Sequence, residues 1–302
     1  MSKRDLAASV RQRLLNQAQD QDRPFQEMLQ YFAMERFLYR LSISAHRDRF
    51  VLKDALLLTA WRAPQSRPTV DIDFAGRTSN EPVHIREMIQ QICAIDIVPD
   101  GLQFDPATVE VFRIKEDAEY EGVRARFQGT LSRARIAMQI DIGFGDVVVP
   151  QPEPLQYPAI LDFPDPVLLS YSRESVIAEK LQALTVLGML NSRLKDYFDL
   201  WLLSRLYSFD GQLLAAAITA TFQNRGTPVE AEPLGLREAY GTEPARLRQW
   251  AAFRRRSRLS TAPENLSDLV QLVHDFATPV LLAIDGKLGF KSTWAPGGPW
   301  SD

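Results

Sequence analysis

The hydrophobic periodicity of this 302-residue chain changes twice, and this change constrains the fold more than any single motif does. Apolar residues recur at helical spacing in residues 3–43, alternate with polar residues in several segments between residues 69 and 144, and return to helical spacing after residue 172. Alternation indicates strands with one buried face, and helical spacing indicates amphipathic helices. We therefore predict a helical N-terminal segment, a small core of strands and helices, and an α-helical C-terminal part.

Turn-forming and proline-rich segments set the boundaries between these parts. Residues 62–68 contain two prolines and are predicted to form a turn, and the proline-rich residues 151–166 are predicted to form an extended linker. The expected parts are a helical segment (1–48), the core (49–166), an α-helical domain (167–293) and a tail (294–302). Two glycines and two prolines lie in the last part, so we expect this tail to be mobile.

The composition excludes several classes of protein. With 35 basic and 38 acidic residues the formal net charge is −3, which argues against a protein that coats DNA through its net charge. A single cysteine excludes an intramolecular disulfide framework and a cysteine-rich zinc site, and the three histidines show no ligand spacing. No stretch approaches the roughly 18–20 apolar residues of a membrane span. We expect a cytoplasmic protein without membrane contact.

Acidic residues lie on two of the predicted strands. Asp71 and Asp73 lie two apart in the segment T-V-D-I-D-F, so both carboxylates point to one face of a strand. Their mutual repulsion is relieved when a cation such as Mg²⁺ or Mn²⁺ lies between them. Asp141 lies on the polar face of a second alternating strand, and three acids from two strands are typical of a two-metal site for phosphoryl or nucleotidyl transfer. The alternative is a pair of solvated carboxylates, since D-x-D is common.

Polar residues also interrupt two apolar helical stripes. Lys180 lies at the centre of a stripe in the segment A-E-K-L-Q-A-L, where its ammonium either contacts a phosphate or an acid, or extends along the stripe to water. Asp196 and Asp199 share a face of the next helix, where Asp196 either pairs with Lys180, acts as a base or ligand, or favours the helix N-terminus. Arg193 and Lys195 flank this turn within reach of phosphates.

Six arginines cluster near two aromatic residues between residues 246 and 258. Arginine beside Trp250 and Phe253 is typical of an RNA acceptor surface, which combines phosphate contacts with base stacking. The simpler interpretation is a solvated amphipathic helix that these two aromatic residues anchor.

Five motifs in order resemble the AbiEii/AbiGii group of nucleotidyltransferase-like toxins, which includes the MenT toxins of mycobacteria. They are L-K-x-A-L-L-L, R-P-T-x-D-I-D-F, Q-I-D-I-G-F-G-D, A-E-K-L-Q-A-L and R-L-K-D-Y-F-D-L, and the resemblance runs from about Phe37 to Leu203. It implies an α+β fold with a DNA-polymerase-β-like nucleotidyltransferase core, made of a small mixed sheet with flanking helices, and an α-helical C-terminal domain.

The resemblance also implies an activity and partners. Members transfer a nucleotide from an NTP, with tRNA acceptor ends as the known target in some, and a cognate antitoxin is the partner. The implied metal ligands are Asp71, Asp73 and Asp141, and the implied catalytic residues are Asp71, Asp73, Lys180 and Asp196. The implied nucleotide-binding residues are Lys53, Arg67, Thr69, Lys180 and Lys195.

Asp54 departs from the pattern of this group. The family usually has glycine after the lysine of L-K-G, at the start of a helix whose amides hold the triphosphate, and here that position is aspartate. Two like charges at ~4 Å repel by about 4 kcal/mol at a surface-like dielectric. Three functions therefore stay open: magnesium-dependent nucleotidyl transfer to RNA, a binding or regulatory module with an impaired nucleotide site, and nucleotidyl transfer to a protein hydroxyl.

Overall fold

The computed structural model describes residues 3–63, 67–117 and 120–302, so residues 64–66 of the predicted turn lie outside the described part. Contacts divide the chain into two compact units. Unit 1 comprises Met1–Arg62, Pro68–Gly145 and Glu153–Ser170, and unit 2 comprises Ala63–Arg67, Asp146–Pro152 and Tyr171–Asp302. The N-terminal helical segment thus belongs to the same unit as the core. Each unit is described below by itself.

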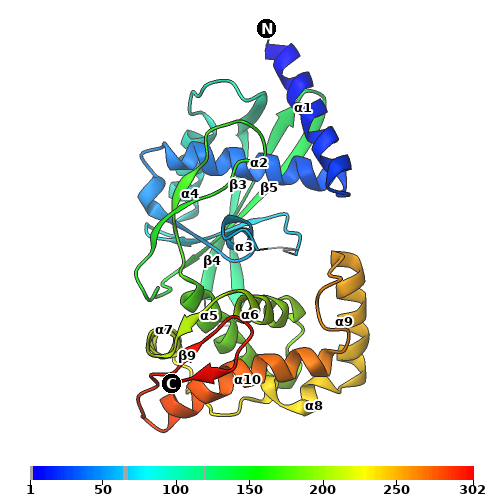
Figure 1. Ribbon diagram of the computed structural model, residues 1–302. Coiled ribbons are helices and arrows are strands. Elements are labelled where there is room, and N and C mark those ends of the chain that lie inside the picture. Colours follow the sequence, from blue (N-terminus) through cyan, green and yellow to red (C-terminus); the bar gives the residue numbers. More distant parts are fainter. Residues whose placement is uncertain (1–2, 64–66, 118–119) are drawn as a thin grey trace. The chain divides into compact units, whose positions relative to one another are not determined.

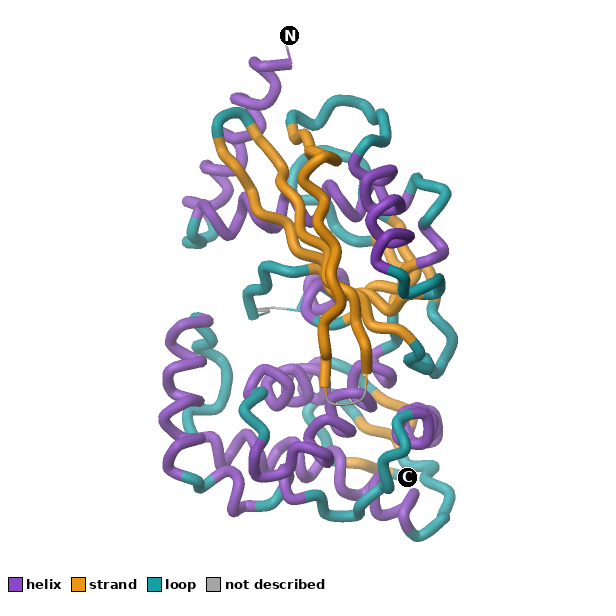
Figure 2. The backbone as a smooth tube through the Cα atoms, turned by 180° about the vertical axis from the view of Figure 1, so that it is seen from behind, coloured by secondary structure: helices purple, strands orange, loops and turns teal. Residues whose placement is uncertain are grey.

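A mixed seven-stranded sheet forms the centre of unit 1, with the strand order β3-β4-β5-β2-β1-β7-β6 (Figures 1 and 2). The strands are β1 (Phe50–Lys53), β2 (Ile72–Gly76), β3 (Leu102–Asp117), β4 (Tyr120–Leu131), β5 (Ala134–Phe144), β6 (Glu153–Gln156) and β7 (Val167–Ser170). Strands β3, β4 and β5 are antiparallel neighbours, whereas β2 runs parallel to β5 and β1 runs parallel to β7. The predicted small mixed sheet with flanking helices is confirmed.

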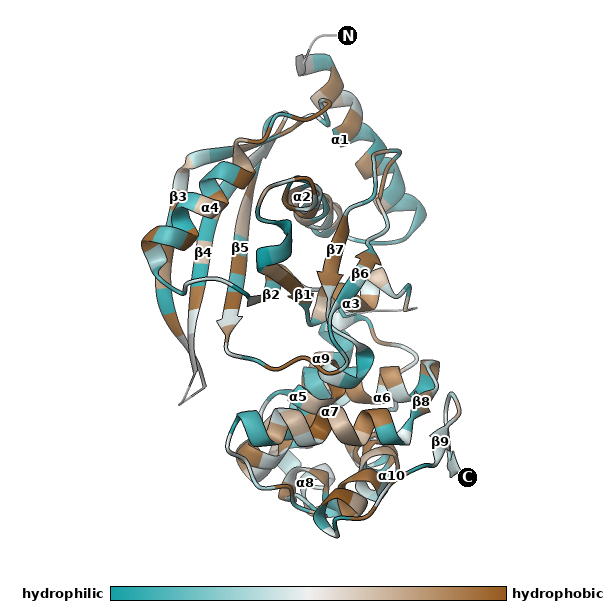
Figure 3. Ribbon diagram, turned by 90° about the vertical axis from the view of Figure 1, so that its left-hand side faces the viewer, coloured by the Kyte–Doolittle hydropathy of each residue, from teal (hydrophilic) through white to brown (hydrophobic). Residues whose placement is uncertain are grey.

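The strict alternation of the sequence gives this sheet one apolar face, and the alternating colours of β4 and β5 in Figure 3 show it. Ile136, Met138 and Ile140 of β5 are buried, whereas Arg135 before them and Ala137 between them are exposed. Helix α2 covers the apolar face, and its Phe37 ring lies 5.3 Å from the ring of Phe127 on β4. The polar residues of these strands therefore lie on the opposite face.

Four α-helices belong to unit 1. They are α1 (Lys3–Asp20), α2 (Phe25–Ser42), α3 (Ala55–Ala60) and α4 (Pro82–Cys93). Helix α2 is buried along nearly its whole length and carries Glu35 and Arg36 inside the unit as an adjacent ion pair. Burial raises the pKa of the Glu35 carboxyl to about 7, against the opposing effect of Arg36. Part of the proline-rich segment forms β6, and the backbone amide of Ile160 donates a hydrogen bond to Glu35.

Unit 2 is mainly α-helical, as the helical spacing predicted. Its helices are α5 (Arg173–Leu187), α6 (Leu194–Leu206), α7 (Gly211–Asn224), α8 (Glu238–Gly241), α9 (Pro244–Ser257) and α10 (Leu266–Asp285). Ser172 caps α5 by accepting a hydrogen bond from the amide of Ser175, and Asp210 caps α7 in the same way. The core side chains come mostly from α5, α6 and α10.

The segment expected as a mobile tail is ordered within unit 2. Strands β8 (Phe209–Asp210), β9 (Thr293–Trp294) and β10 (Trp300–Ser301) form a small antiparallel sheet. The Trp300 ring stacks on Phe276 of α10 with 5.7 Å between ring centroids, and Trp294 packs edge-on against the same ring at 4.9 Å. Aromatic burial thus holds a segment whose glycine and proline content predicted a loose end.

Helix α10 is, in the described part of the chain, the one helix that is long and apolar enough to cross a membrane. It has 20 residues with a mean hydropathy of 1.2, and half of this window is buried against the rest of the protein. The sequence analysis expected no stretch of this kind. Core helices of proteins without any membrane contact meet the same two criteria, and α10 supplies Phe276, Val273 and Leu281 to the core of unit 2.

Candidate functional site

Four charged side chains form a row across four adjacent strands of unit 1. The register pairs Lys53 of β1 with Asp73 of β2, Asp73 with Asp141 of β5, and Asp141 with Arg124 of β4. Residues paired in this way point to the same face of a sheet, and neighbouring strands lie about 4.8 Å apart. Two carboxylates therefore lie side by side with one cation on each outer side. The structure brings Asp141 next to Asp73, as the sequence predicted.

Arg124 neutralises the third acid of the row directly. Its guanidinium donates to both carboxylate oxygens of Asp141, with 2.7 Å from Nε to Oδ1 and 2.6 Å from Nη2 to Oδ2. The hydrogen bond to Asp141 raises the pKa of Arg124, partial burial opposes this, and the charges of Asp141, Asp71 and Asp73 add to it. The negative potential of all three acids therefore acts on one guanidinium.

Asp71 lies just before β2 and is oriented by its neighbour Thr69. The Thr69 hydroxyl donates to Asp71 Oδ1 at 2.5 Å, and the Thr69 amide donates to the Tyr31 hydroxyl of α2 at 3.2 Å. Strand β2 begins at Ile72, so the predicted strand 69–74 starts three residues later than expected. Thr69, predicted to bind nucleotide, is buried and positions an acid of the predicted metal site.

The donor set of this row can be tested against a divalent ion. Mg²⁺ usually takes one or two carboxylates together with substrate phosphates, and Asp71 and Asp73 provide two half-buried carboxylates. Within residues 3–63, 67–117 and 120–302, no three His, Cys, Asp or Glu side chains form a group that could hold a metal. The residues present therefore fit a two-carboxylate site, with Asp141 held by Arg124 beside it.

A second charged cluster is buried in unit 2 around Lys180. The Lys180 ammonium lies 3.0 Å from Asp196 Oδ1 and 2.9 Å from Asp199 Oδ2, and Lys180 is only 4% exposed. Arg193 Nε lies 2.9 Å from the other oxygen of Asp196. Of the alternatives at Lys180, the structure shows pairing with acids rather than extension to water. Asp196, which is fully buried in the first turn of α6, is thus neutralised by two cations.

Arg67 completes this cluster. Its guanidinium donates to both oxygens of Asp199 at 3.0 Å, and both side chains are buried. Burial opposes the ionisation of Asp199, but the charges of Arg67 and Lys180 outweigh it and lower the pKa of this carboxyl. Arg67 was predicted to bind nucleotide, and the structure places its guanidinium on Asp199. Lys195, predicted for the same role, is exposed on the outer surface of α6.

Asp54 has a backbone conformation that favours glycine. It lies between β1 and α3 with φ 58° and ψ −138°, outside the left-handed helical region that aspartate tolerates. The sequence comparison with the family indicated glycine at this position, and the backbone geometry gives a reason for it. A Cβ atom here is strained whatever charge the side chain carries.

Two residues of these clusters were not assigned by the sequence analysis. Arg124 lies on the polar face of an alternating segment, and the register of that segment with the strand of Asp141 was the signal that could have found it. Asp199 was noted as an acid on an apolar stripe without a role. Its two partners come from segments 19 and 132 positions away, and this distance in sequence left no local signal.

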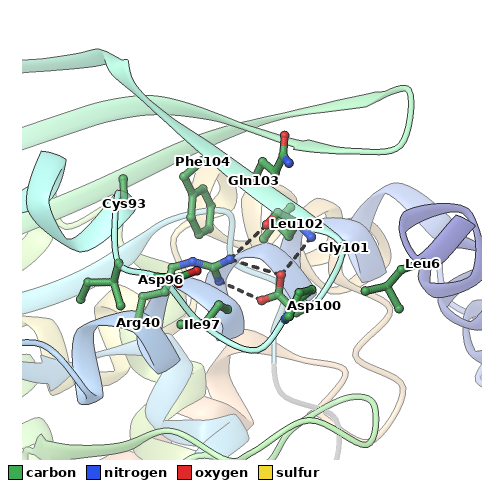
Figure 4. Close-up of a pocket in the computed structure, with 12 residues that line it drawn as sticks. Leu6, Arg40, Cys93, Asp96, Ile97, Asp100, Gly101, Leu102, Gln103 and Phe104 are labelled. Carbon is green, nitrogen blue, oxygen red and sulfur yellow. Dashed lines mark hydrogen bonds and ion pairs between the residues drawn. The ribbon is translucent and has the colours of Figure 1, made fainter. Parts of the chain in front are cut away.

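A third cluster lies in unit 1 outside the predicted site (Figure 4). Arg40 of α2 donates to both oxygens of Asp100 at 2.9 and 3.2 Å and to the carbonyl of Leu102, beside a cavity of about 290 Å³. Burial raises the pKa of the neighbouring Cys93 thiol to about 12, so this thiol is unreactive at neutral pH. The cluster orders the segment between α4 and β3, and this structural role accounts for its residues.

The part of the chain that carries these clusters matches a known protein family. The sequence profile of the family described as nucleotidyl transferase AbiEii toxin of type IV toxin–antitoxin systems matches residues 36–274. The chain belongs to this family. The predicted resemblance is therefore confirmed, and the AbiEii match covers both the acidic row of unit 1 and the Lys180 cluster of unit 2. No curated protein sequence matches this AbiEii protein.

Two solved structures from Helicobacter pylori are similar to this AbiEii protein. One is described as a candidate nucleotidyltransferase, with 14% sequence identity, a TM-score of 0.47, and coverage of 87% of this chain and 96% of that chain. The other is JHP933, with 14% identity, a TM-score of 0.49, and coverage of 87% and 93%.

Proposed function

We propose that this AbiEii protein is a magnesium-dependent nucleotidyltransferase that transfers a nucleotide from an NTP to an RNA acceptor, namely the acceptor end of tRNA. One observation carries the proposal: Asp73 and Asp141 lie side by side on adjacent strands, flanked by Lys53 and Arg124, with Asp71 just before β2. The two carboxylates repel each other across the strand pair, and this repulsion is relieved by Lys53 and Arg124 and further by a bound divalent cation.

The proposed roles follow from the chemistry of each group. Asp71 and Asp73 would hold Mg²⁺ or Mn²⁺, and Thr69 orients Asp71 for this purpose. The ion, when bound, supplies positive charge for the developing charge on the transferred phosphoryl group and the leaving pyrophosphate. Arg124 fixes Asp141 beside this pair through two charge-assisted hydrogen bonds.

The Lys180 cluster would provide the phosphate-binding charge. Lys180 contacts a phosphate, and Asp196 is a positioning residue rather than a base, because two cations already hold its carboxylate. Arg67 and Asp199 fix Lys180 from the other side. Neither Asp196 nor Asp199 acts as a proton acceptor.

Family membership implies a toxin whose partner is an antitoxin. We infer that the toxic activity is the nucleotidyl transfer itself. Expression of the wild-type chain would then arrest growth, and Asp71→Ala would abolish the arrest without changing the amount of folded protein. Arrest that persists in Asp71→Ala would show that another property of the protein is toxic.

Transfer is tested by incubating the chain with tRNA, Mg²⁺ and each of the four α-labelled NTPs in turn. We expect a labelled RNA with at least one NTP, no label after EDTA treatment, and no label with Asp73→Asn. Mass spectrometry of the labelled product separates an RNA acceptor from a protein hydroxyl. Absence of label with all four NTPs, under conditions where a related toxin labels tRNA, would refute the proposal.

A second candidate function has a specific observation in its favour. Asp54 places a carboxylate and a Cβ atom where the family has glycine, in a conformation with φ 58°. The protein would then be a binding or regulatory module that keeps the fold and the antitoxin contacts but does not bind NTP. Calorimetric titration with NTP distinguishes the two functions: no binding by the wild type and measurable binding by Asp54→Gly would support the module.

A further inference from the structure

A cavity of about 750 Å³ lies in unit 2 between the start of α6 and the helix α9. Its size lies within the range of known ligand sites, which is roughly 300–1,000 Å³. Its lining includes four cationic side chains, an amide and an aromatic ring: Arg193, Lys195, Arg255, Arg256, Gln249 and Phe253. No acidic residue lines it. We call it the α6–α9 pocket.

The positive charge of this pocket is largely uncompensated. Arg193 is paired with Asp196, but Lys195, Arg255 and Arg256 are exposed and make no ion pair in the part of the chain that the structure describes. Three cations that converge on one cavity repel each other, and this repulsion is relieved when an anion binds between them. The pocket is therefore built for a ligand that carries more than one negative charge.

The composition of α9 extends this charge beyond the pocket. The 14-residue helix contains five arginines and no acidic residue, although the whole chain has a formal net charge of −3. The helix dipole favours basic residues in the last turn, which accounts for part of the charge at residues 254–256. It does not account for the exposed Arg248 near the other end. A helix with basic residues near both ends and no acidic residue is typical of a surface that binds a polyanion.

An aromatic ring lies among these charges. Phe253 is half-buried and lies in the lining of the pocket, with its ring held by Trp250 at 5.7 Å and by Phe198 of α6 at 6.4 Å. A fixed ring beside arginines offers a stacking surface for a base, which a site for inorganic phosphate alone does not need. The amide of Gln249 adds a donor and an acceptor at the same wall.

We propose that the α6–α9 pocket binds a single-stranded segment of RNA, with the phosphates on Lys195, Arg255 and Arg256 and a base on Phe253. The proposal deepens the proposed function and rests on it, because it names the surface that holds the RNA acceptor. Arg193 connects the two clusters: it lines the pocket and pairs with Asp196, which holds Lys180. The strand in the pocket thus binds directly beside the proposed phosphate-binding residues of unit 2.

The experiment measures binding without transfer. An end-labelled RNA hairpin with a single-stranded 3′ extension of four nucleotides is titrated with the full chain in the absence of NTP, by filter binding at several salt concentrations. The double variant Arg255→Gln/Arg256→Gln is expected to bind roughly tenfold more weakly at 0.15 M salt and to lower the salt slope by about 1.4, which corresponds to two phosphate contacts of a single strand. Lys195→Gln tests the same pocket from α6.

Matched controls separate the pocket from net charge. Arg86→Gln/Arg133→Gln removes two exposed arginines of unit 1 and is expected to leave affinity and salt slope unchanged. Phe253→Leu keeps an apolar core contact and is expected to lower affinity without changing the salt slope, because stacking releases no counterion.

Three outcomes would overturn the pocket proposal: no RNA binding by the wild type, equal binding by wild type and pocket variants, or equal losses in the control double variant. Tight binding of polyglutamate but not of RNA would also overturn it and would indicate an acidic protein partner. The two proposals fail separately. If a pocket variant binds RNA normally and still transfers a nucleotide to it, only the proposal on the pocket is refuted. If the wild type binds RNA through the pocket but transfers no nucleotide, only the proposed enzymatic function is refuted.

Discussion

Replacing Asp54 by glycine tests whether the backbone at the start of α3 is strained in this protein. Residues other than glycine cost about 1–3 kcal/mol in rarely populated backbone regions, and Asp54 has φ 58° and ψ −138°. Relief of this strain in Asp54→Gly is offset by about 0.5–1 kcal/mol, because glycine raises the conformational entropy of the unfolded chain. The net stabilisation is about 1 kcal/mol, which raises the Tm of a domain of this size by about 2–4 °C.

The assay is differential scanning calorimetry of the full chain, with Asp54→Ala as the matched control. Alanine removes the carboxylate but keeps the Cβ atom, so its strain is the same as that of aspartate. We expect a higher Tm for Asp54→Gly and an unchanged or lower Tm for Asp54→Ala. If both variants raise the Tm equally, the charge and not the backbone is responsible. If Asp54→Gly lowers the Tm, the strain argument is wrong.

Three further predictions concern other charged residues. The free energy of unfolding is expected to fall by up to about 3 kcal/mol as the pH rises from 4.5 to about 7, because Glu35 keeps its proton in the folded protein and releases it in the unfolded chain. Urea unfolding at a series of pH values measures this decrease, and Glu35→Gln should remove it. Asp73→Asn should lower nucleotidyl transfer roughly a hundredfold or more. The same variant should have an unchanged or higher Tm, because the amide no longer repels Asp141, and a lower Tm would contradict this repulsion. Asp100→Ala should destabilise the protein by about 3–5 kcal/mol in urea unfolding, because Arg40 stays buried without its partner, and a loss below 1 kcal/mol would show that water compensates this charge.

The sequence predicted those parts of the fold that have a clear period. The helices of unit 2 and the strands β3, β4 and β5 appear where apolar spacing placed them. Strands β6 to β10 were missed, because each has only two to four residues and such short segments show no period. The N-terminal helices pack on the sheet as part of unit 1, which follows from long-range contacts that periodicity does not encode.

The sequence also predicted only part of the candidate site. Alternation placed Asp73 and Asp141 on the polar faces of their strands, but their contact depends on β2 pairing with β5, which lies more than 60 residues further along the chain. The pairing of Lys180 with Asp196 was among the alternatives because both lie on apolar stripes. The bond between Arg67 and Asp199 had no local signal, since long-range packing alone brings these residues together.

The aromatic cluster at the end of the chain has a practical consequence for every unfolding experiment. Of the five tryptophans, Trp61 belongs to unit 1, whereas Trp201, Trp250, Trp294 and Trp300 belong to unit 2. Intrinsic fluorescence will therefore report chiefly the loss of packing around α10. A spectroscopist who follows emission alone would record the melting of the helical unit and overlook an earlier or later transition of the sheet.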